Sequence, residues 1–276
     1  MASKVQSRVF STEALRSLAR PELTYFICTN PRSGSWLLSE ALASTELAGN
    51  PREWFNPYEE KHQRTANSRW IDAAFSSYFR HAIGLATTLN GICGIKIHYY
   101  QFILLIKQLR SFFDCQEVTR SELIKVAFPN TRFVWLSREN KERQALSYYK
   151  ARQTNQWWLL CGREVKPNAT MPDAHIDLED IWRLENLVRN HEDRWASFFS
   201  EANLTPLRMS YEHLCGAYEE TVREILRWLG IPEASSVIIP APRLQRQSDQ
   251  ATEDHLALYS RFKAQQAAMA DSGYST

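Results

Sequence analysis

The sequence predicts an α/β fold in which helices cover both faces of a central parallel sheet. Short runs of apolar, aromatic and β-branched residues alternate with helical patterns over most of the 276 residues. Most of these runs are followed by a helical pattern, as expected of parallel strands joined by crossovers. The length and a hydrophobic content of 44% fit one large domain, or at most two small ones, and we expect a single domain over residues 1–276.

Four runs are candidate strands. The first, Leu23–Thr29, is apolar and aromatic and stops at Asn30-Pro31, which indicates a buried strand ahead of a loop. The others cover residues 91–97, 131–137 and, more weakly, 206–210. Ligands of parallel α/β sheets bind at the carboxyl ends of the strands, so we expect functional residues to cluster where these runs end.

Three helical patterns follow from the apolar spacing. After the loop that follows the first strand, Leu38 and Leu42 repeat one helical turn apart. A longer pattern over residues 178–200 carries apolar residues at core-facing positions. The third, over residues 218–229, ends at Gly230, a residue type that commonly stops helices.

Charge and composition exclude several classes of protein. The 33 Lys and Arg residues exceed the 31 Asp and Glu residues by only two, which argues against nucleic acid or an anionic membrane as the main partner. The longest aliphatic and aromatic run, Phe102–Ile106, is far shorter than the roughly 20 residues that cross a bilayer, so we expect no transmembrane segment. Five widely spaced cysteines without CxxC pairs indicate a reducing cytoplasm and no metal site.

Two segments are expected at the periphery. Residues 1–21 lack a secretory hydrophobic segment; their Arg and Ser content is weakly similar to a transit peptide, but we interpret them as a peripheral helix. Residues 164–173, with two prolines and an asparagine, are expected to form a surface loop.

The loop after the first strand carries the sharpest chemical signal. Backbone N–H groups at a helix N-terminus, made approachable by Gly34, form a cradle for a phosphate or sulfate. Arg32, Ser33 and Ser35 add donors to this cradle. A nucleoside triphosphatase loop would read GxxxxGK[ST], and neither its first glycine nor its lysine is present, so ATP hydrolysis is disfavoured. The alternative interpretation is an ordinary N-capped turn.

A second anion site is indicated after the third strand. Arg138 stands at the strand end, and Ser147 follows nine residues later within a helical pattern. A guanidinium forks around a phosphate and a hydroxyl can complete the contact. Alone, this pair also fits a solvated surface. Two strand-end anion sites together describe a nucleotide with phosphates at both ends of its ribose.

At this point the sequence resembles sulfotransferases that use 3′-phosphoadenosine 5′-phosphosulfate (PAPS). Residues 31–40, Pro-Arg-Ser-Gly-Ser-Trp-Leu-Leu-Ser-Glu, resemble their 5′-phosphosulfate loop, and Arg138 with Ser147 resembles their 3′-phosphate site. Further blocks in the same order are most similar to the bacterial trehalose 2-sulfotransferase family. These blocks are Ala48-Gly-Asn-Pro-Arg-Glu-Trp-Phe55, Ala151-Arg-Gln-Thr-Asn-Gln-Trp157, Tyr211-Glu-His-Leu214, Leu229-Gly-Ile-Pro232 and Arg243-Leu-Gln-Arg-Gln-Ser-Asp249. The resemblance runs from about Tyr25 to Phe262.

The resemblance implies a P-loop-type three-layer domain that moves a sulfuryl group from PAPS to a hydroxyl of a carbohydrate or glycolipid, such as a trehalose-like sugar. It also implies a homodimer, and the chemistry requires no metal. The residues implied to hold the donor are Arg32, Ser33, Gly34 and Ser35 at the 5′ phosphosulfate, Arg138 and Ser147 at the 3′ phosphate, and Arg243 and Arg246 closing over the nucleotide. A P-loop small-molecule kinase holding Mg–ATP and a non-catalytic nucleotide-binding protein are the alternatives.

Two candidate bases lie on different segments. In-line sulfuryl transfer needs positioning, charge stabilisation and a base for the acceptor hydroxyl. By resemblance, Glu53 occupies the position of the general base, although an exposed turn acid is the alternative. Lys96 and His98 share a face of the second strand and are similar to the Lys-x-His of animal cytosolic sulfotransferases, where the His is catalytic. Lys96 would then neutralise the bridging oxygen, and Arg32 the leaving phosphate.

Aromatic residues near these positions suggest where an acceptor sugar binds. Flat rings suit the C–H faces of sugars; Trp54 and Phe55 lie next to Glu53 in the sequence, and Trp157 with Trp158 follows the second anion site. They could instead be core or dimer contacts. One departure from the family concerns Trp36, which stands where the family carries a Thr that contacts the 5′ phosphate. We expect weaker donor binding rather than its loss, because the backbone cradle does not depend on that side chain.

Overall fold

A four-stranded parallel sheet organises the fold. The computed structural model describes residues 21–56, 72–158, 176–243 and 250–272. The strands are β1 (Leu23–Thr29), β2 (Ile92–His98), β3 (Thr131–Ser137) and β4 (Leu207–Ser210), in the spatial order β2-β1-β3-β4. All neighbouring strands pair in parallel, so the predicted fold class is confirmed, with one-residue shifts at both ends of the second strand and at the start of the fourth.

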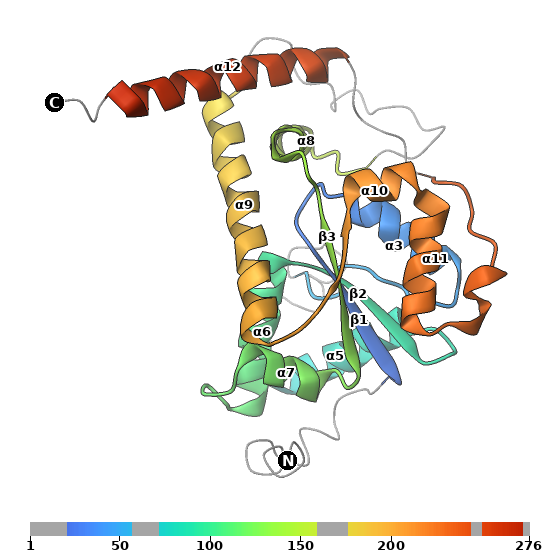
Figure 1. Cartoon of the computed structure of the whole chain (residues 1–276). Coiled ribbons are helices and arrows are strands. Elements are labelled where there is room, and N and C mark those ends of the chain that lie inside the picture. Colours follow the sequence, from blue (N-terminus) through green and yellow to red (C-terminus); the bar gives the residue numbers. More distant parts are fainter. Residues whose placement is uncertain (1–20, 57–71, 159–175, 244–249, 273–276) are drawn as a thin grey trace.

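Helices cover the sheet on both sides (Figure 1). They are α3 (Ser35–Ser44), α5 (Asp72–Ala86), α6 (Tyr99–Phe113), α7 (Arg120–Ala127), α8 (Lys141–Thr154), α9 (Leu178–Glu201), α10 (Tyr211–Gly216), α11 (Tyr218–Leu229), the short 3-10 helix η2 (Pro232–Ser235) and α12 (Gln250–Ser272). Helices α5, α6, α7 and α9 lie on one face, and α3, α10 and α11 lie on the other. None of the described helices is long and apolar enough to cross a membrane.

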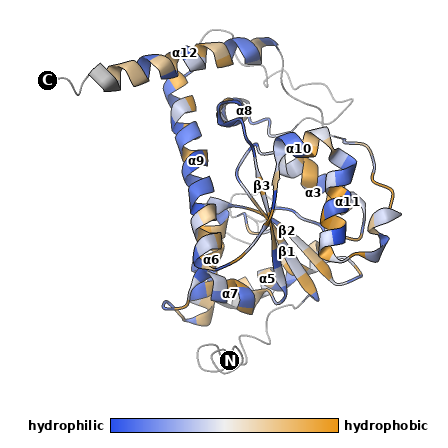
Figure 2. Cartoon of the chain, in the orientation of Figure 1, coloured by the Kyte–Doolittle hydropathy of each residue, from blue (hydrophilic) through white to orange (hydrophobic). Residues whose placement is uncertain are grey.

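Alternation along β1 divides the interior into two cores. Phe26 and Cys28 point to the face covered by α5, α6, α7 and α9, where aromatic side chains dominate. Tyr25 and Ile27 point to the opposite face, against α3 and α11. Figure 2 shows hydrophobic and hydrophilic residues mixed along α9 and α11, as expected of helices that bury one side. The central strand is therefore enclosed on both faces.

Helix α12 is an element that the sequence interpretation missed. It crosses the ends of α8 and α9 (Figure 1) and buries Leu256 and Tyr259 against them. The Tyr259 hydroxyl donates to Glu185 Oε2 at 2.8 Å, and Lys263 forms an ion pair with the same buried carboxylate at 3.1 Å. The helices predicted at 178–200 and 218–229 are confirmed within one residue. The predicted segments 1–21 and 164–173 lie outside the described residues, except for Pro21.

The loop after α3 docks directly on β2. Gly49 has φ +68°, and a Cβ there would lie 2.4 Å from the backbone nitrogen of Gly94. The Lys96 amide then donates to the Arg52 carbonyl at 3.0 Å, which fixes the segment that carries Glu53. The close backbone contact therefore determines where this acid lies relative to the sheet.

Replacing Gly49 by alanine is expected to lower the free energy of unfolding by roughly 2–5 kcal/mol, from a left-handed backbone penalty plus overpacking. Urea unfolding measures it. Gly230→Ala is the matched control, because Gly230 has φ +82° but a Cβ added there would meet no other atom within 4 Å. That control should lose only about 1–2 kcal/mol. Equal losses in the two variants would contradict the close-contact argument.

Candidate active site

The carboxyl ends of β1 and β2 lie side by side, because Thr29 pairs with His98 in the parallel register. The loop that follows β1 turns through Arg32, at φ +63°, and Gly34, at φ +80°, into the N-terminus of α3. A Cβ at Gly34 would lie 2.4 Å from the Tyr211 ring, so a glycine is required there. The structure thus places a helix N-terminus, with its unpaired N–H groups, at the strand ends.

The two serines of this loop are buried. Ser33 is fully buried and its hydroxyl hydrogen bonds to the Thr29 hydroxyl, which in turn donates to the Leu136 carbonyl at 2.9 Å. Ser35 is 5% exposed at the first position of α3. The Ser33 side chain therefore anchors the loop to the strand ends, a role that the sequence pattern did not reveal.

The predicted second anion site adjoins the loop. Arg138 Nη1 donates to the Arg32 carbonyl at 3.1 Å, and Arg32 Nε donates to Ser147 Oγ at 2.9 Å. Residues 32, 138 and 147 therefore lie together. The side chain that hydrogen bonds to Ser147 is that of Arg32 rather than that of Arg138. The Arg138 guanidinium also lies 4.6 Å from the centre of the Tyr211 ring.

The charge at this position suits an anion. Burial, together with the nearby positive charge of Arg138, lowers the pKa of Arg32 to about 10. Burial also lowers the pKa of Arg138. Arg138 Nε is buried and has no hydrogen-bond partner among the described residues. An anionic ligand would reduce the repulsion between the two guanidinium groups and would accept a hydrogen bond from Arg138 Nε. These residues therefore fit a phosphorylated ligand.

The two candidate bases meet in one cluster. Glu53 Oε1 lies 2.9 Å from Lys96 Nζ and 3.3 Å from His98 Nε2. Gln101 Nε2 donates to Glu53 Oε2 at 2.6 Å, a contact that sequence reasoning missed. Lys96 and His98 are buried, and the Glu53 side chain is 20% exposed. Glu53 is therefore a partly enclosed carboxylate rather than an exposed turn acid.

Opposing effects set the protonation of Glu53. Burial alone would raise its pKa, but the positive charges of His98 and Lys96, with their hydrogen bonds, hold the pKa well below the usual range. The carboxylate is therefore ionised at neutral pH and able to accept a proton. His98 Nδ1 is buried and makes no hydrogen bond within the described part of the chain.

Trp36 lies between the anion loop and this cluster. Its ring stacks on Trp158 with centroids 5.0 Å apart and an interplanar angle of 13°. Arg52 Cζ and Lys96 Nζ lie 4.7 and 4.8 Å from the centre of the Trp36 ring. The residue that departs from the family pattern therefore contacts the proposed catalytic lysine.

The other predicted aromatic residues differ in accessibility. Phe55 is 3% exposed and packs among core rings including Phe79 and Phe128, so it cannot contact an acceptor. Trp54 is partly buried and its indole donates to the Asn50 carbonyl at 2.8 Å. Trp157 is 37% exposed, and its carbonyl accepts a hydrogen bond from Arg32.

The predicted C-terminal arginines cannot both be placed. Arg243 is exposed at the end of a described segment, whereas Arg246 lies outside the described residues. Their closure over a nucleotide stays a prediction.

Comparison with known proteins identifies the family of the chain. The profile of the Stf0 sulphotransferase family matches residues 24–265. The chain belongs to this family. This Stf0 sulphotransferase is 26% identical over 259 residues to "Trehalose 2-sulfotransferase" of Mycolicibacterium smegmatis, covering 86% of this chain and 94% of that protein.

Two further proteins are similar to this sulfotransferase. A protein of the same name from Mycobacterium tuberculosis is 24% identical over 270 residues, covering 88% of this chain and 96% of that one. A crystal structure of a sulfotransferase from Alicyclobacillus acidocaldarius is 13% identical, covers 91% of this chain and 96% of that chain, and has a TM-score of 0.45. This TM-score is too low for the structural similarity to support the family assignment.

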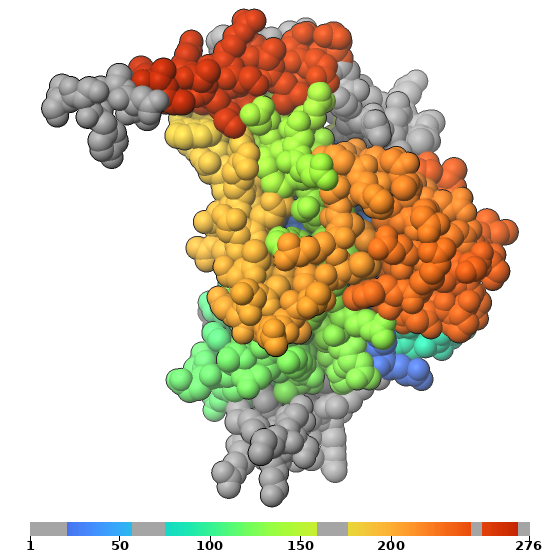
Figure 3. All heavy atoms as spheres, in the orientation of Figure 1, coloured from blue at the N-terminus to red at the C-terminus, as the bar shows by residue number. Residues whose placement is uncertain are grey.

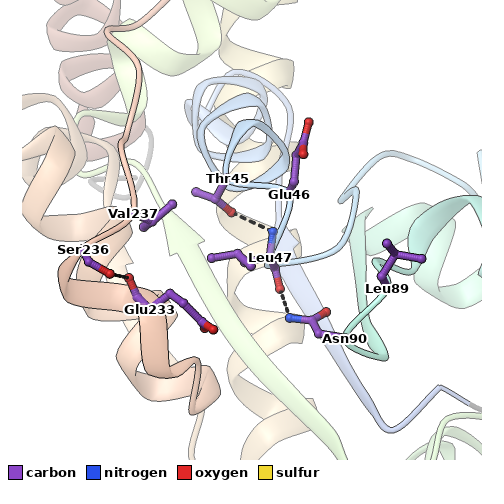
Figure 4. A pocket seen from close by; sticks show the side chains of 8 residues that line it. All are labelled: Thr45, Glu46, Leu47, Leu89, Asn90, Glu233, Ser236 and Val237. Atoms are coloured by element: carbon purple, nitrogen blue, oxygen red, sulfur yellow. Dashed lines mark hydrogen bonds between the residues drawn. The ribbon is translucent and has the colours of Figure 1, made fainter.

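Two surface hollows lie apart from the carboxylate cluster of this sulfotransferase. One, of about 500 Å³, lies near the start of β2, is lined by residues from Thr45 to Leu47, from the turn at Asn90 and from η2, and contains none of the predicted site residues (Figure 4). The other, of about 240 Å³, is lined by residues of α9, β3 and β4 (Figure 3). Trp135 and Arg208 line this second hollow, so neither hollow belongs to the cluster around Glu53.

The ion pairs of Glu53 make stability depend on pH. The folded-state pKa lies below the unfolded value of 4.5, so ionised Glu53 stabilises the fold above that pH and ceases to do so as pH falls through the folded pKa. We expect the stability advantage of the wild type over Glu53→Gln to be constant near neutral pH and to shrink in acid. Urea unfolding of both proteins across this range measures it, and an advantage that grows on acidification would contradict the assigned direction.

Proposed function

We propose that this protein transfers a sulfuryl group from PAPS to a hydroxyl of a carbohydrate or glycolipid acceptor. The observation that carries the proposal is the ionised Glu53, held by Lys96 and His98 beside a helix N-terminus suited to anions. Family membership gives the reaction class, which is sulfuryl transfer. The named activity of the two similar mycobacterial proteins supports a sugar such as trehalose as acceptor.

Donor binding is assigned to the loop and its neighbours. The backbone of Gly34 and Ser35, with the Arg32 guanidinium, would hold the 5′ phosphosulfate at the N-terminus of α3. Arg138 and Ser147 would hold the 3′ phosphate, which is supported by the buried and unpartnered Arg138 Nε. Both ends of the nucleotide would then contact residues that hydrogen bond to one another in the protein.

The transfer step needs no covalent intermediate on the protein. The acceptor oxygen forms a bond to sulfur while the bond from sulfur to the 5′-phosphate oxygen breaks, releasing 3′-phosphoadenosine 5′-phosphate. Glu53 takes the acceptor proton. Lys96 neutralises the charge that develops on the bridging oxygen, and Arg32 stabilises the leaving phosphate.

His98 serves Glu53 in this proposal. Its Nε2 faces the Glu53 carboxylate, so its hydrogen bond orients that carboxylate and stabilises its ionised form. The kinase alternative does not fit a member of a sulfotransferase family, whereas a non-catalytic nucleotide-binding protein is an outcome of the experiments below. The homodimer implied by the resemblance stays a prediction.

Arg138→Gln is expected to weaken binding of 3′-phosphoadenosine 5′-phosphate by about 10- to 100-fold, because a charge-assisted contact to the 3′ phosphate is lost. Adenosine 5′-phosphosulfate, which lacks that phosphate, should bind nearly as before. Isothermal titration calorimetry without magnesium measures both. Arg208→Gln on β4 is the matched control and should change neither. An equal loss for both nucleotides would show that Arg138 does not read the 3′ phosphate.

Glu53→Gln is expected to reduce turnover by about 10²- to 10⁴-fold, because a positioned base is removed while the size of the side chain is kept. The assay is transfer of labelled sulfate from PAPS to trehalose, lipopolysaccharide sugars and simple alcohols. His98→Asn should lose less. A loss below tenfold in folded Glu53→Gln, with a larger loss in His98→Asn, would transfer the role of base to His98. Wild-type nucleotide binding without transfer to any acceptor would favour the non-catalytic alternative.

A further inference from the structure

Four aromatic side chains from separate positions gather beside the carboxylate cluster. Trp36, near the start of α3, stacks on Trp158, which lies beyond the end of α8. Tyr148 on α8 contacts Trp157 with ring centres 6.0 Å apart and an interplanar angle of 56°. Trp157 and Trp158 were singled out from the sequence as residues for the acceptor, whereas Trp36 was noted there for its departure from the family pattern.

Lys96 contacts both the stacked tryptophan pair and the proposed base, Glu53. Lys96 Nζ is 4.8 Å from the centre of the Trp36 ring and 2.9 Å from Glu53 Oε1. Tyr148 is also close to Glu53: burial raises the tyrosine pKa, and the negative charge of Glu53 contributes to the same shift. The stacked pair therefore lies next to the lysine that pairs with the proposed base.

The outer ring of the stack is open to a ligand. Trp158 is 50% exposed although it is already stacked, and its neighbour Trp157 is 37% exposed. Exposed aromatic surface next to polar, charged groups is typical of a binding site rather than of a packed core. In addition, Trp36 Nε1 is buried and has no hydrogen-bond partner among the described residues.

These features together favour one ligand class. The π face of an indole attracts the slightly positive C–H groups on the flat side of a pyranose, while nearby polar groups bond its hydroxyls. We propose that Trp36 and Trp158 form a stacking platform for a pyranose ring of the acceptor, with Trp36 a specificity-determining residue. The proposal rests on the proposed function and adds the residues that select the acceptor.

The test compares two acceptors that differ in the presence of a ring. Methyl α-glucoside has a pyranose C–H face, whereas sorbitol has a similar number of hydroxyls on an open chain. For wild type with PAPS, we expect the glucoside to have the higher kcat/KM. Trp158→Ala should raise the KM for the glucoside by about 3- to 10-fold, leave kcat within twofold, and leave the sorbitol values unchanged.

Variants of Trp36 separate its ring from its N–H group. Trp36→Phe keeps a ring and should raise the glucoside KM less than Trp36→Leu does. Trp36→Leu should also lower kcat, because Lys96 loses its aromatic contact. Trp182→Ala, which removes a tryptophan that is 38% exposed and packs on Phe262, is the matched control and should change no kinetic value.

The outcomes distinguish the platform from the function. Calorimetry with 3′-phosphoadenosine 5′-phosphate checks that each variant is folded and binds the nucleotide. Unchanged glucoside KM in Trp158→Ala and Trp36→Leu, with normal nucleotide binding, would overturn the platform and leave the sulfotransferase assignment intact. Preference of the wild type for an aryl alcohol such as 4-nitrophenol over the glucoside would overturn the pyranose assignment. Failure of the wild type to sulfate any acceptor would instead count against the proposed function.

Discussion

The parallel pairing of β1 with β2 is the constraint on which the rest of the site depends. It sets Thr29 beside His98, so the anion loop and the carboxylate cluster begin at neighbouring strand ends. The loop that carries Glu53 reaches the same edge because its backbone lies directly against β2, where Lys96 donates to the Arg52 carbonyl. A shift of one residue in this register would turn Lys96 and His98 to the other face of the sheet.

Charge compensation explains why the site holds its shape. Lys96 is almost fully buried, and a buried cation is costly unless it is paired, so Glu53 and the Trp36 ring are both required around it. At the other end of the site, Arg32 and Arg138 are partly buried close to each other, which favours an anion between or beside them. The positive charge of Lys96 is thus balanced by a carboxylate of the protein itself, whereas that of Arg32 and Arg138 is suited to the negative charge of a ligand.

Local sequence patterns predicted the fold class and several of its elements. Strand β1, the loop with Gly34 and the helices α9 and α11 follow from periodicity and stop signals. The sequence offered Glu53 and the Lys96–His98 pair as separate candidates, and only the structure brought them into contact. Gln101 was missed because its contact depends on a helix cap at His98. Phe55 was predicted to contact the acceptor because it is close to Glu53 in the sequence. In the structure Phe55 lies in the hydrophobic core whereas Glu53 is partly exposed, a difference that depends on packing and not on sequence distance.

The anchoring of α12 has a consequence for the integrity of the chain. Glu185 lies inside the protein, and its carboxylate is neutralised and hydrogen bonded partly by Tyr259 and Lys263 from the last helix. Without those partners an anion would face an apolar interior, with Arg189 as its remaining partner among the described residues. Helix α12 is therefore part of one cooperative unit with α8 and α9. Removing the residues from Tyr259 onward would destabilise α8, the helix that carries Ser147.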